Sequence, residues 1–135
     1  MTFSRFQIIG PSGSGKTTLA KQLSKKLKIP HYELDSLFWL PRWQEKPTKE
    51  FKREVREIIS NDEFILCGDY MNRLEGITLK RVQVVLWLNY PISVFIPRMI
   101  FRTTKRAFTR EKIWGINRES FINFWFRPSK SLSLI

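Results

Sequence analysis

Apolar side chains recur along the chain with two alternating periods, one typical of strands and one typical of helices. Short, nearly continuous apolar runs predict strands, at residues 6–9, 31–34, 64–67 and 82–88. Apolar residues three and four positions apart predict helices, at residues 17–27, 48–60, 89–108 and 118–127. This alternation favours right-handed crossovers and a parallel sheet covered by helices. The run at 82–88 is the most apolar, so we expect it to be a central strand.

Prolines and polar segments separate these elements. The buried face of the first helix is marked by Leu19, Leu23 and Leu27. We expect Pro30 to end that helix and Pro97 to kink or divide the helix of residues 89–108. The remaining stretches are a loop-rich segment, a short helix or turn and a basic segment, at residues 36–47, 73–79 and 109–117.

The length of 135 residues predicts a single domain, residues 1–135, large enough to fold without disulfides. Cys67 is the single cysteine and has no intrachain partner. No long apolar run is present, and we expect no signal peptide because the first strand is predicted to begin close to Met1. We therefore expect a reduced, cytoplasmic protein with no membrane association.

The segment from Gly10 to Thr17 fits the P-loop pattern G-x-x-x-x-G-K-[ST], between a predicted strand and a predicted helix. Its glycines let backbone N–H groups converge on an anion, and the helix N-terminus adds a partial positive charge. Lys16 would reach the β- and γ-phosphates, and the Thr17 hydroxyl would ligate Mg²⁺. The residues expected to bind a nucleoside triphosphate are Gly10, Ser12, Gly13, Ser14, Gly15, Lys16, Thr17 and Thr18. A flexible Gly/Ser turn that matches by chance is the alternative.

An acid follows the second predicted strand, at the sheet edge where α/β proteins bind their ligands. Asp35 would there orient or deprotonate an acceptor hydroxyl, unless it is a solvated loop acid or a helix cap. Phe38, Trp39 and Trp43 follow it, and their rings would either pack in the core or line an acceptor pocket. His31, the only histidine, is expected to be structural.

The third strand lacks the acid that commonly holds Mg²⁺ in P-loop enzymes. Its last residue is Cys67, which is expected to be a small buried hydrophobe. Asp69 comes two residues later and is either a metal ligand or a turn residue.

Arginines repeat every four residues in the helix of residues 89–108. Arg98, Arg102 and Arg106 would share one face, and Arg110 and Arg118 follow. Arginine forks bind phosphate oxygens and stabilise charge on a transferring phosphoryl group. We expect Arg102 and Arg106 to act in catalysis, within a lid at about residues 98–118; a solvated helix face is the alternative.

The positive charge is concentrated in the second half. Residues 1–70 hold 12 Lys and Arg against 9 Asp and Glu, whereas residues 71–135 hold 12 against 3. The excess of positive charge in residues 71–135 favours an anionic partner, which is either nucleic acid or the nucleotide itself.

Four segments together resemble the adenylate-kinase-related P-loop proteins called DNA topology modulation proteins. They are residues 10–20, residues 34–39 with Trp43, residues 67–70 and residues 114–120. The resemblance spans residues 6–127 and implies a nucleoside-kinase-like, three-layer αβα fold around a parallel sheet. It also implies ATP at the P-loop, an acceptor near Asp35, with an acceptor-side insert at about 36–60, and the arginine lid.

The chain departs from this family in two places. The family has Asp-Gly-Asn-Tyr where this chain has Cys67-Gly68-Asp69-Tyr70, which weakens the expectation of turnover. Relatives continue into a last helix and strand, which residues 129–135 do not resemble, so we expect the sheet to lack its last strand.

Two functions follow from these patterns. The first is a small phosphotransferase that uses Mg²⁺-ATP on a small-molecule or nucleotide acceptor. The second is a nucleotide-binding protein with weak catalysis that acts through DNA or a protein partner. A GTPase is disfavoured because no Asn-Lys-x-Asp segment is present.

Overall fold

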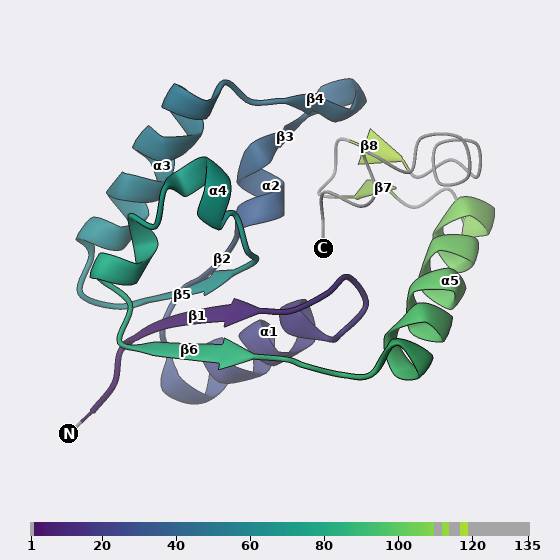
Figure 1. The fold of residues 1–135 in the computed structure, drawn as a ribbon, viewed down its shortest axis with the longest axis horizontal. Helices are drawn as coiled ribbons and strands as arrows, with labels where there is room; N and C mark the ends of the chain where they lie inside the picture. Colours follow the sequence, from purple (N-terminus) through teal and green to yellow (C-terminus); the bar gives the residue numbers. More distant parts are fainter. Residues whose placement is uncertain (1, 110–111, 114–116, 119–135) are drawn as a thin grey trace.

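The computed structural model describes residues 2–109, 112–113 and 117–118 (Figure 1). The first half of these residues forms β1 (Arg5–Ile9), α1 (Lys16–Leu27), β2 (His31–Glu33), α2 (Leu34–Phe38), β3 (Trp39–Leu40), the 3₁₀ turn η1 (Pro41–Trp43), β4 (Gln44–Glu45) and α3 (Thr48–Ser60). The second half forms β5 (Phe64–Cys67), α4 (Met71–Leu74), the 3₁₀ turn η2 (Thr78–Lys80), β6 (Val84–Trp87), α5 (Ile92–Thr109), β7 (Lys112–Ile113) and β8 (Asn117–Arg118).

Four parallel strands form the central sheet, in the order β2-β5-β1-β6. The predicted α/β class and parallel sheet are therefore confirmed. The two innermost strands are β1 and β5, and every residue of β5 is buried. The carboxyl ends of all four strands point toward the same edge, where the loop after β1 also lies (Figure 1).

One face of the sheet is covered by α1. Its core contains Phe6 and Ile8 of β1 with Ile65 and Cys67 of β5, packed against Ala20 of α1. Within α1 the leucine periodicity predicted the buried face only in part. Ala20 is fully buried, whereas Leu27 at the last turn is 38% exposed. The helix ends there because Lys28 adopts a left-handed conformation, with φ of 61°.

The opposite face carries a larger core beneath α2, α3 and α4 (Figure 1). The predicted helix at residues 48–60 is confirmed as α3, and its Phe51, Val55 and Ile59 are buried. The aromatic residues after Asp35 also pack here, since Phe38 and Trp39 are only 3% and 2% exposed. Of the two roles open to these two rings, core packing is the one that the structure shows.

The segment after β2 is more regular than its loop-rich composition suggested. Asp35 does not follow the strand directly, because β2 ends at Glu33 and Leu34 begins the helix α2. A small antiparallel hairpin of β3 and β4 follows, closed by the turn η1. Arg42 and Trp43 in that turn both have positive φ, of 59° and 56°.

The expectation of a central strand at 82–88 is wrong. Among the described residues β6 pairs with β1 alone and forms an edge of the sheet. Its exposure alternates, with Val85 and Trp87 at 45% and 67%. An apolar run of this kind is typical of central strands, but it fits equally a strand that is covered on one face only.

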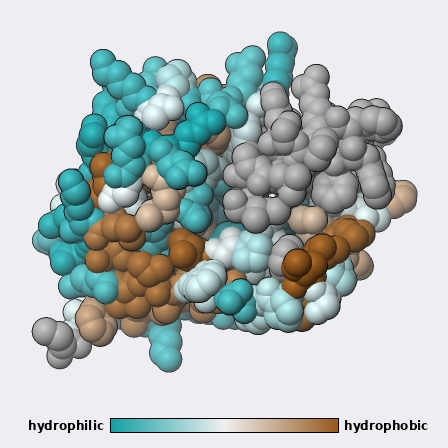
Figure 2. Space-filling model, in the orientation of Figure 1, coloured by the Kyte–Doolittle hydropathy of each residue, from teal (hydrophilic) through white to brown (hydrophobic). Residues whose placement is uncertain are grey.

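The helix α5 continues past Pro97, so of the two effects expected of this proline, a kink or a division, the division does not occur. Its exposed apolar residues include Ile92, Ile96, Ile100 and Phe101, and Figure 2 shows an apolar area over this helix. The basic segment after α5 contains the short hairpin of β7 and β8. Apart from Arg118, which is in β8, the helix predicted at 118–127 lies outside the described residues. Within the described part of the chain, no helix has the length and apolarity needed to cross a membrane.

Candidate active site

The P-loop lies between β1 and α1, where its sequence placed it, and its glycines adopt the backbone that the motif requires. Gly13 and Gly15 have φ of 80° and 92°, which side chains with a Cβ rarely adopt. Gly10 has φ of 149°, and a Cβ there would lie 2.7 Å from the carbonyl oxygen of Leu88. The loop is thus shaped by Leu88, the residue that follows β6, as well as by its own sequence.

Lys16 is folded onto the loop. Its Nζ donates to the carbonyl oxygens of Gly10 and Pro11, at 2.7 and 2.8 Å. Burial lowers the pKa of Lys16, while the carboxylate of Asp35 opposes that shift. The ammonium group is therefore held at the mouth of the loop, where a phosphate would be bound.

Ser14 has a buried hydroxyl at the same loop. It is 3% exposed, and its Oγ has no hydrogen-bond partner among the described residues. A buried hydroxyl without a partner is costly unless a ligand completes it. A phosphate oxygen would satisfy this group.

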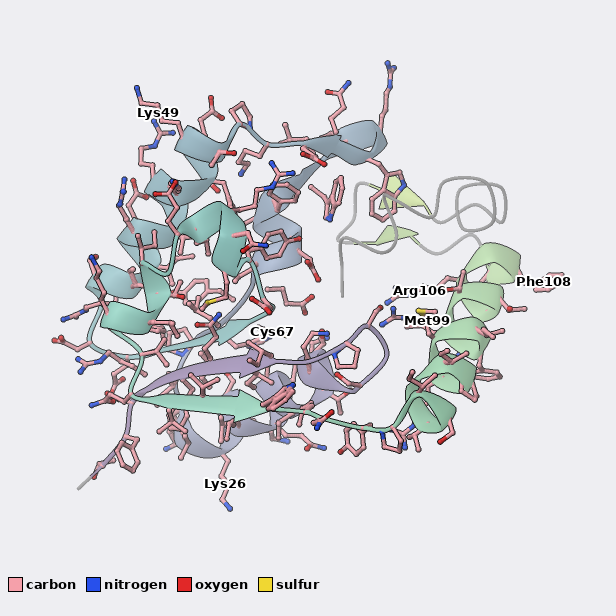
Figure 3. The ribbon with its side chains drawn as sticks, in the orientation of Figure 1. Lys26, Lys49, Cys67, Met99, Arg106 and Phe108 are labelled. Atoms are coloured by element: carbon pink, nitrogen blue, oxygen red, sulfur yellow. The ribbon has the colours of Figure 1, made fainter. Side chains whose placement is uncertain are left out.

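Thr17 and Cys67 face each other across the floor of the site. The Thr17 Oγ1 is 3.9 Å from the Cys67 Sγ. Burial raises the pKa of Cys67 to about 11, so the thiol is neutral at pH 7. Cys67 thus occupies the end of β5 as a small buried side chain (Figure 3), as its residue type predicted.

Asp35 lies in the first turn of α2, near the P-loop lysine. Burial raises the pKa of its carboxyl, whereas a hydrogen bond from Tyr70 and the charge of Lys16 lower it. The Tyr70 hydroxyl donates to Asp35 Oδ1 at 2.5 Å. Asp35 is therefore a partly buried carboxyl beside a cation, an environment found often at catalytic acids and bases.

The arginines of α5 divide according to what they contact. Arg102 Nη2 donates to the Ser12 hydroxyl at 2.6 Å, so α5 contacts the P-loop directly. The charge of Arg102 also affects the pKa of both Lys16 and Asp35. Arg98 instead lies over the ring of Tyr90, 5.8 Å from its centroid.

Arg106 is partly buried and extends from α5 toward the loop after β1, whereas Phe108 points away from it (Figure 3). Arg110 lies outside the described residues. The structure thus brings Lys16, Asp35 and Arg102 into one electrostatic neighbourhood, with Arg106 on the same side of α5.

Asp69 makes its side-chain contact within a turn and also contributes to the electrostatics of Lys16. Its carboxylate is exposed and accepts a hydrogen bond from the Met71 backbone N–H at 3.1 Å. That contact spans two residues and forms a turn just before α4, which is the turn role that the sequence left open. Its charge is the last of the four that influence Lys16.

Three further residues of the site escaped the sequence-based reasoning. Glu33 is the β2 partner of Cys67 in the sheet register, and its charge affects the pKa of both Cys67 and Asp35. Gln7 is a buried polar residue on β1, and its Nε2 donates to the Gly68 carbonyl at 3.2 Å. Tyr70 is the third. A polar side chain inside an apolar strand, as at Gln7, is the signal that would have found one of them.

Comparison with known proteins places this site in a family. The family model described as shikimate kinase matches residues 12–124. The uncharacterized protein YqaC of Bacillus subtilis (strain 168) is 33% identical over 102 residues, which are 73% of this chain and 56% of that protein. The chain therefore spans little more than half the length of this curated relative.

Solved kinase structures share the fold. A shikimate kinase from Aquifex aeolicus vf5 superposes with a TM-score of 0.52 at 21% identity, covering 70% of this chain and 68% of that one. A sugar kinase from Janibacter sp. HTCC2649 gives a TM-score of 0.54 at 18% identity, covering 99% and 79%. At these identities the two structures support the fold alone. The family model, however, covers most of the chain from within the P-loop to beyond β8, and the chain belongs to the shikimate kinase family of P-loop proteins.

Proposed function

We propose that this protein is a phosphotransferase that uses Mg²⁺-ATP to phosphorylate a small acceptor. The observation that carries the proposal is the convergence of Lys16, Asp35 and Arg102, which come from the P-loop, α2 and α5. A cation at the phosphates, a carboxyl for the acceptor and an arginine beside the loop are groups that recur in phosphoryl-transfer enzymes. The match to the family model described as shikimate kinase supports the same class of reaction.

Asp35, Lys16 and Arg102 would have different roles in the transfer of the γ-phosphoryl group. The acceptor hydroxyl would give its proton to Asp35 as its oxygen forms a bond to the γ-phosphorus. The bond from that phosphorus to the bridging oxygen would break, and ADP would leave. Lys16 and Arg102 would stabilise the negative charge on the transferring group and the leaving oxygen.

The residues of the site fit ATP with its magnesium ion. The positive-φ glycines and the buried, unpartnered Ser14 hydroxyl suit a triphosphate. Among the described residues no cluster of three His, Cys, Asp or Glu side chains could hold a metal ion alone. Mg²⁺ in kinases is held mainly by phosphate oxygens and water with few protein ligands, and the Thr17 hydroxyl would supply one here. The ion would neutralise charge on the phosphates. The sequence prediction of Asp69 as a second ligand remains a proposal.

Loss of the P-loop lysine tests nucleotide binding. Lys16→Ala removes the ammonium group that faces the phosphates, and we expect affinity for a fluorescent ATP analogue to fall about tenfold or more, the usual order for a charge-assisted contact. Lys26→Ala is the matched control, because Lys26 lies at the far end of α1 and points away from the site (Figure 3). A wild-type protein that binds no nucleotide at millimolar Mg²⁺-ATP would contradict the proposal.

The acceptor can be sought with a panel of hydroxyl compounds. Shikimate, pentoses, hexoses, nucleosides and nucleoside monophosphates would each be incubated with labelled ATP, and transfer of label measured. Asp35→Asn should bind ATP normally but transfer label at least a hundredfold more slowly, consistent with the usual contribution of a general base. Equal transfer rates in wild type and Asp35→Asn would remove Asp35 from the mechanism.

One observation favours the second candidate function. In that function the protein binds nucleotide, catalyses only weakly, and acts through DNA or a protein partner. The neutral Cys67 thiol occupies the position where P-loop enzymes commonly carry a metal-binding acid. This would suit the narrower assignment to the DNA topology modulation proteins, which stays a proposal. Tight nucleotide binding without transfer to any acceptor would favour this function over the first.

A further inference from the structure

The carboxylate of Asp35 is held by a tyrosine instead of by a cation. Among the described residues Asp35 makes no ion pair within 4 Å, although Lys16 and Arg102 are near enough to affect its charge. Instead, the Tyr70 hydroxyl donates a hydrogen bond to its Oδ1, at 2.5 Å. A phenol that donates to an ionised carboxylate forms a strong, short hydrogen bond.

Tyr70 is itself fixed on both sides. Its ring centroid lies 4.9 Å from that of Phe38 and 5.2 Å from that of Phe51. These two rings are 3% and 0% exposed, so the phenol is embedded in the core of α2 and α3 with only its hydroxyl directed to the site. A ring held in this way has little freedom to move its hydroxyl.

The backbone before Tyr70 explains how a residue after β5 comes to face α2. Gly68 has φ of 127°, and a Cβ there would lie 3.3 Å from the Leu34 Cβ. The chain therefore passes close to the start of α2 and turns. Asp69 then accepts a hydrogen bond from the Met71 N–H, and Tyr70 between them is the N-cap residue of α4. Gly68 and Asp69 thus shape the turn that places Tyr70 beside α2.

We propose that Tyr70 is a positioning residue for phosphoryl transfer, which holds Asp35 Oδ1 so that Oδ2 is presented to the acceptor hydroxyl. The inference rests on the proposed function. A carboxyl kept without an ion pair in a partly buried site lowers stability, and a purely structural contact would be served better by an apolar pair. The arrangement is understandable if the carboxylate is needed for chemistry and must not rotate.

The contact can be tested without any catalytic activity. The chain has three tyrosines, so incorporation of 3-fluorotyrosine gives three ¹⁹F resonances, and Tyr70→Phe assigns the one of interest. Asp35→Asn should shift the Tyr70 resonance and leave the other two in place. Asp62→Asn is the control, because that carboxylate is 95% exposed and pairs with Arg81. A Tyr70 resonance that does not respond to Asp35→Asn would overturn the inference.

The positioning role is tested by kinetics with the acceptor that the panel identifies. Tyr70→Phe keeps the ring and removes the hydroxyl, so the fold should be retained, as a thermal melt would check. We expect kcat to fall about tenfold, the factor that corresponds to one such hydrogen bond, with KM for ATP unchanged. Tyr32→Phe, which removes a hydroxyl from β2 in the same core, should leave both constants as in wild type.

The outcomes separate the two proposals. If Asp35→Asn blocks transfer but Tyr70→Phe has the wild-type kcat, the function stands and the positioning role is wrong. If no acceptor is phosphorylated, the proposed function fails, and the positioning role fails with it, whatever the ¹⁹F spectra show of the contact. An equal loss of kcat in Tyr70→Phe and Tyr32→Phe would also refute a specific role for Tyr70.

Discussion

Cys67 stands where a metal-binding acid is common, which weakens the capacity of this site to bind Mg²⁺. Its thiol is buried, neutral at pH 7 and 3.9 Å from the Thr17 hydroxyl. A neutral thiol is a poor ligand for a hard cation such as Mg²⁺, which prefers oxygen. The register of β2 and β5 places Glu33 beside it, so negative charge is available near the floor of the site, from a neighbouring strand.

A carboxylate at this position should strengthen the response to magnesium. In Cys67→Asp, the new oxygens would lie next to Thr17, and we expect Mg²⁺ to raise the affinity for the ATP analogue about tenfold more than in wild type, a gain of roughly 1.4 kcal/mol. The measurement is a nucleotide titration with and without Mg²⁺. Cys67→Ser is the control, since it matches the thiol in size without charge. The same response in both variants would show that an acid here is immaterial.

Asp35 should make the fold less stable at neutral pH. Burial raises its pKa in the folded state above the ordinary 3.8, so the folded state binds this proton more tightly than the unfolded chain. By linkage, stability is lost as the pH rises from the unfolded value through the raised folded value. Asp35→Asn removes this loss, and we expect it to stabilise the protein at pH 7 by on the order of 1 kcal/mol, reduced by the weakened bond from Tyr70.

Thermal unfolding at pH 7 and at pH 4.5 checks the sign. The melting temperature of Asp35→Asn should exceed that of wild type at pH 7, and the difference should shrink at pH 4.5. Asp62→Asn should show no comparable gain, because Asp62 is almost fully exposed. A variant that melts below wild type at pH 7 would mean that the bond to Tyr70 outweighs the burial of the charge.

The P-loop depends on a close approach between two neighbouring elements. The loop leaves β1 at Gly10, and the chain leaves β6 at Leu88, whose N–H donates to the Ile9 carbonyl at 2.9 Å. Only a residue without a Cβ fits between them. The helix α5 completes the enclosure through the Arg102–Ser12 bond, so the loop is held by β6 on one side and by α5 on the other.

A methyl group at Gly10 should disturb this junction. In Gly10→Ala the new Cβ would lie 2.7 Å from a backbone oxygen, and φ of 149° is also unfavourable for alanine. Gly76→Ala is the matched control. Gly76 also has a positive φ, of 68°, but a Cβ added there would meet no atom within 4 Å. We expect Gly10→Ala to lower the free energy of unfolding by about 1–3 kcal/mol more than Gly76→Ala, the usual range for an enforced backbone strain. Equal losses in urea denaturation would show that the approach to β6 yields easily.

The molecule as a whole carries a large positive charge, +12 over 135 residues. Its described surface also includes an uncharged part, since no Lys, Arg, His, Asp or Glu occurs from residue 82 to residue 97, which spans β6 and the first turns of α5. Basic and apolar surfaces are thus separated along the chain. A polyanion would be attracted by the first and would gain nothing from the second.

Duplex DNA should therefore bind through charge alone. We expect fluorescence anisotropy to show affinity that is independent of DNA sequence and that falls about a hundredfold or more between 50 and 200 mM salt. Lys16→Ala should bind DNA as wild type does, because that lysine is partly buried in the loop. Affinity that resists salt, or that distinguishes sequences, would point to base contacts instead.

Local patterns predicted the elements well, because each depends on neighbours in sequence. The P-loop motif, the periodicity of α3 and the apolar run of β5 each specify their own conformation. The order of strands depends on contacts between distant residues, so the apolarity of β6 did not reveal its edge position. The bond from Tyr70 to Asp35 joins residues 35 positions apart, and the pairing of β2 with β5 and the turn at Gly68 bring them together. Arg102 was predicted from spacing, but its contact with Ser12 spans 90 positions.

The folded-back Lys16 has a thermodynamic consequence for any phosphate ligand. Its ammonium group already donates to two loop carbonyls, so a nucleotide must exchange those partners for phosphate oxygens. The heat released on binding is then the difference between two sets of similar contacts and is smaller than the lysine–phosphate attraction itself. Because Lys16→Ala frees both carbonyls, its loss of affinity would understate that attraction. Calorimetry would measure the heat of nucleotide binding to wild type and to Lys16→Ala. The difference between the two heats would show how much of the lysine–phosphate attraction is offset by the loss of the two carbonyl contacts.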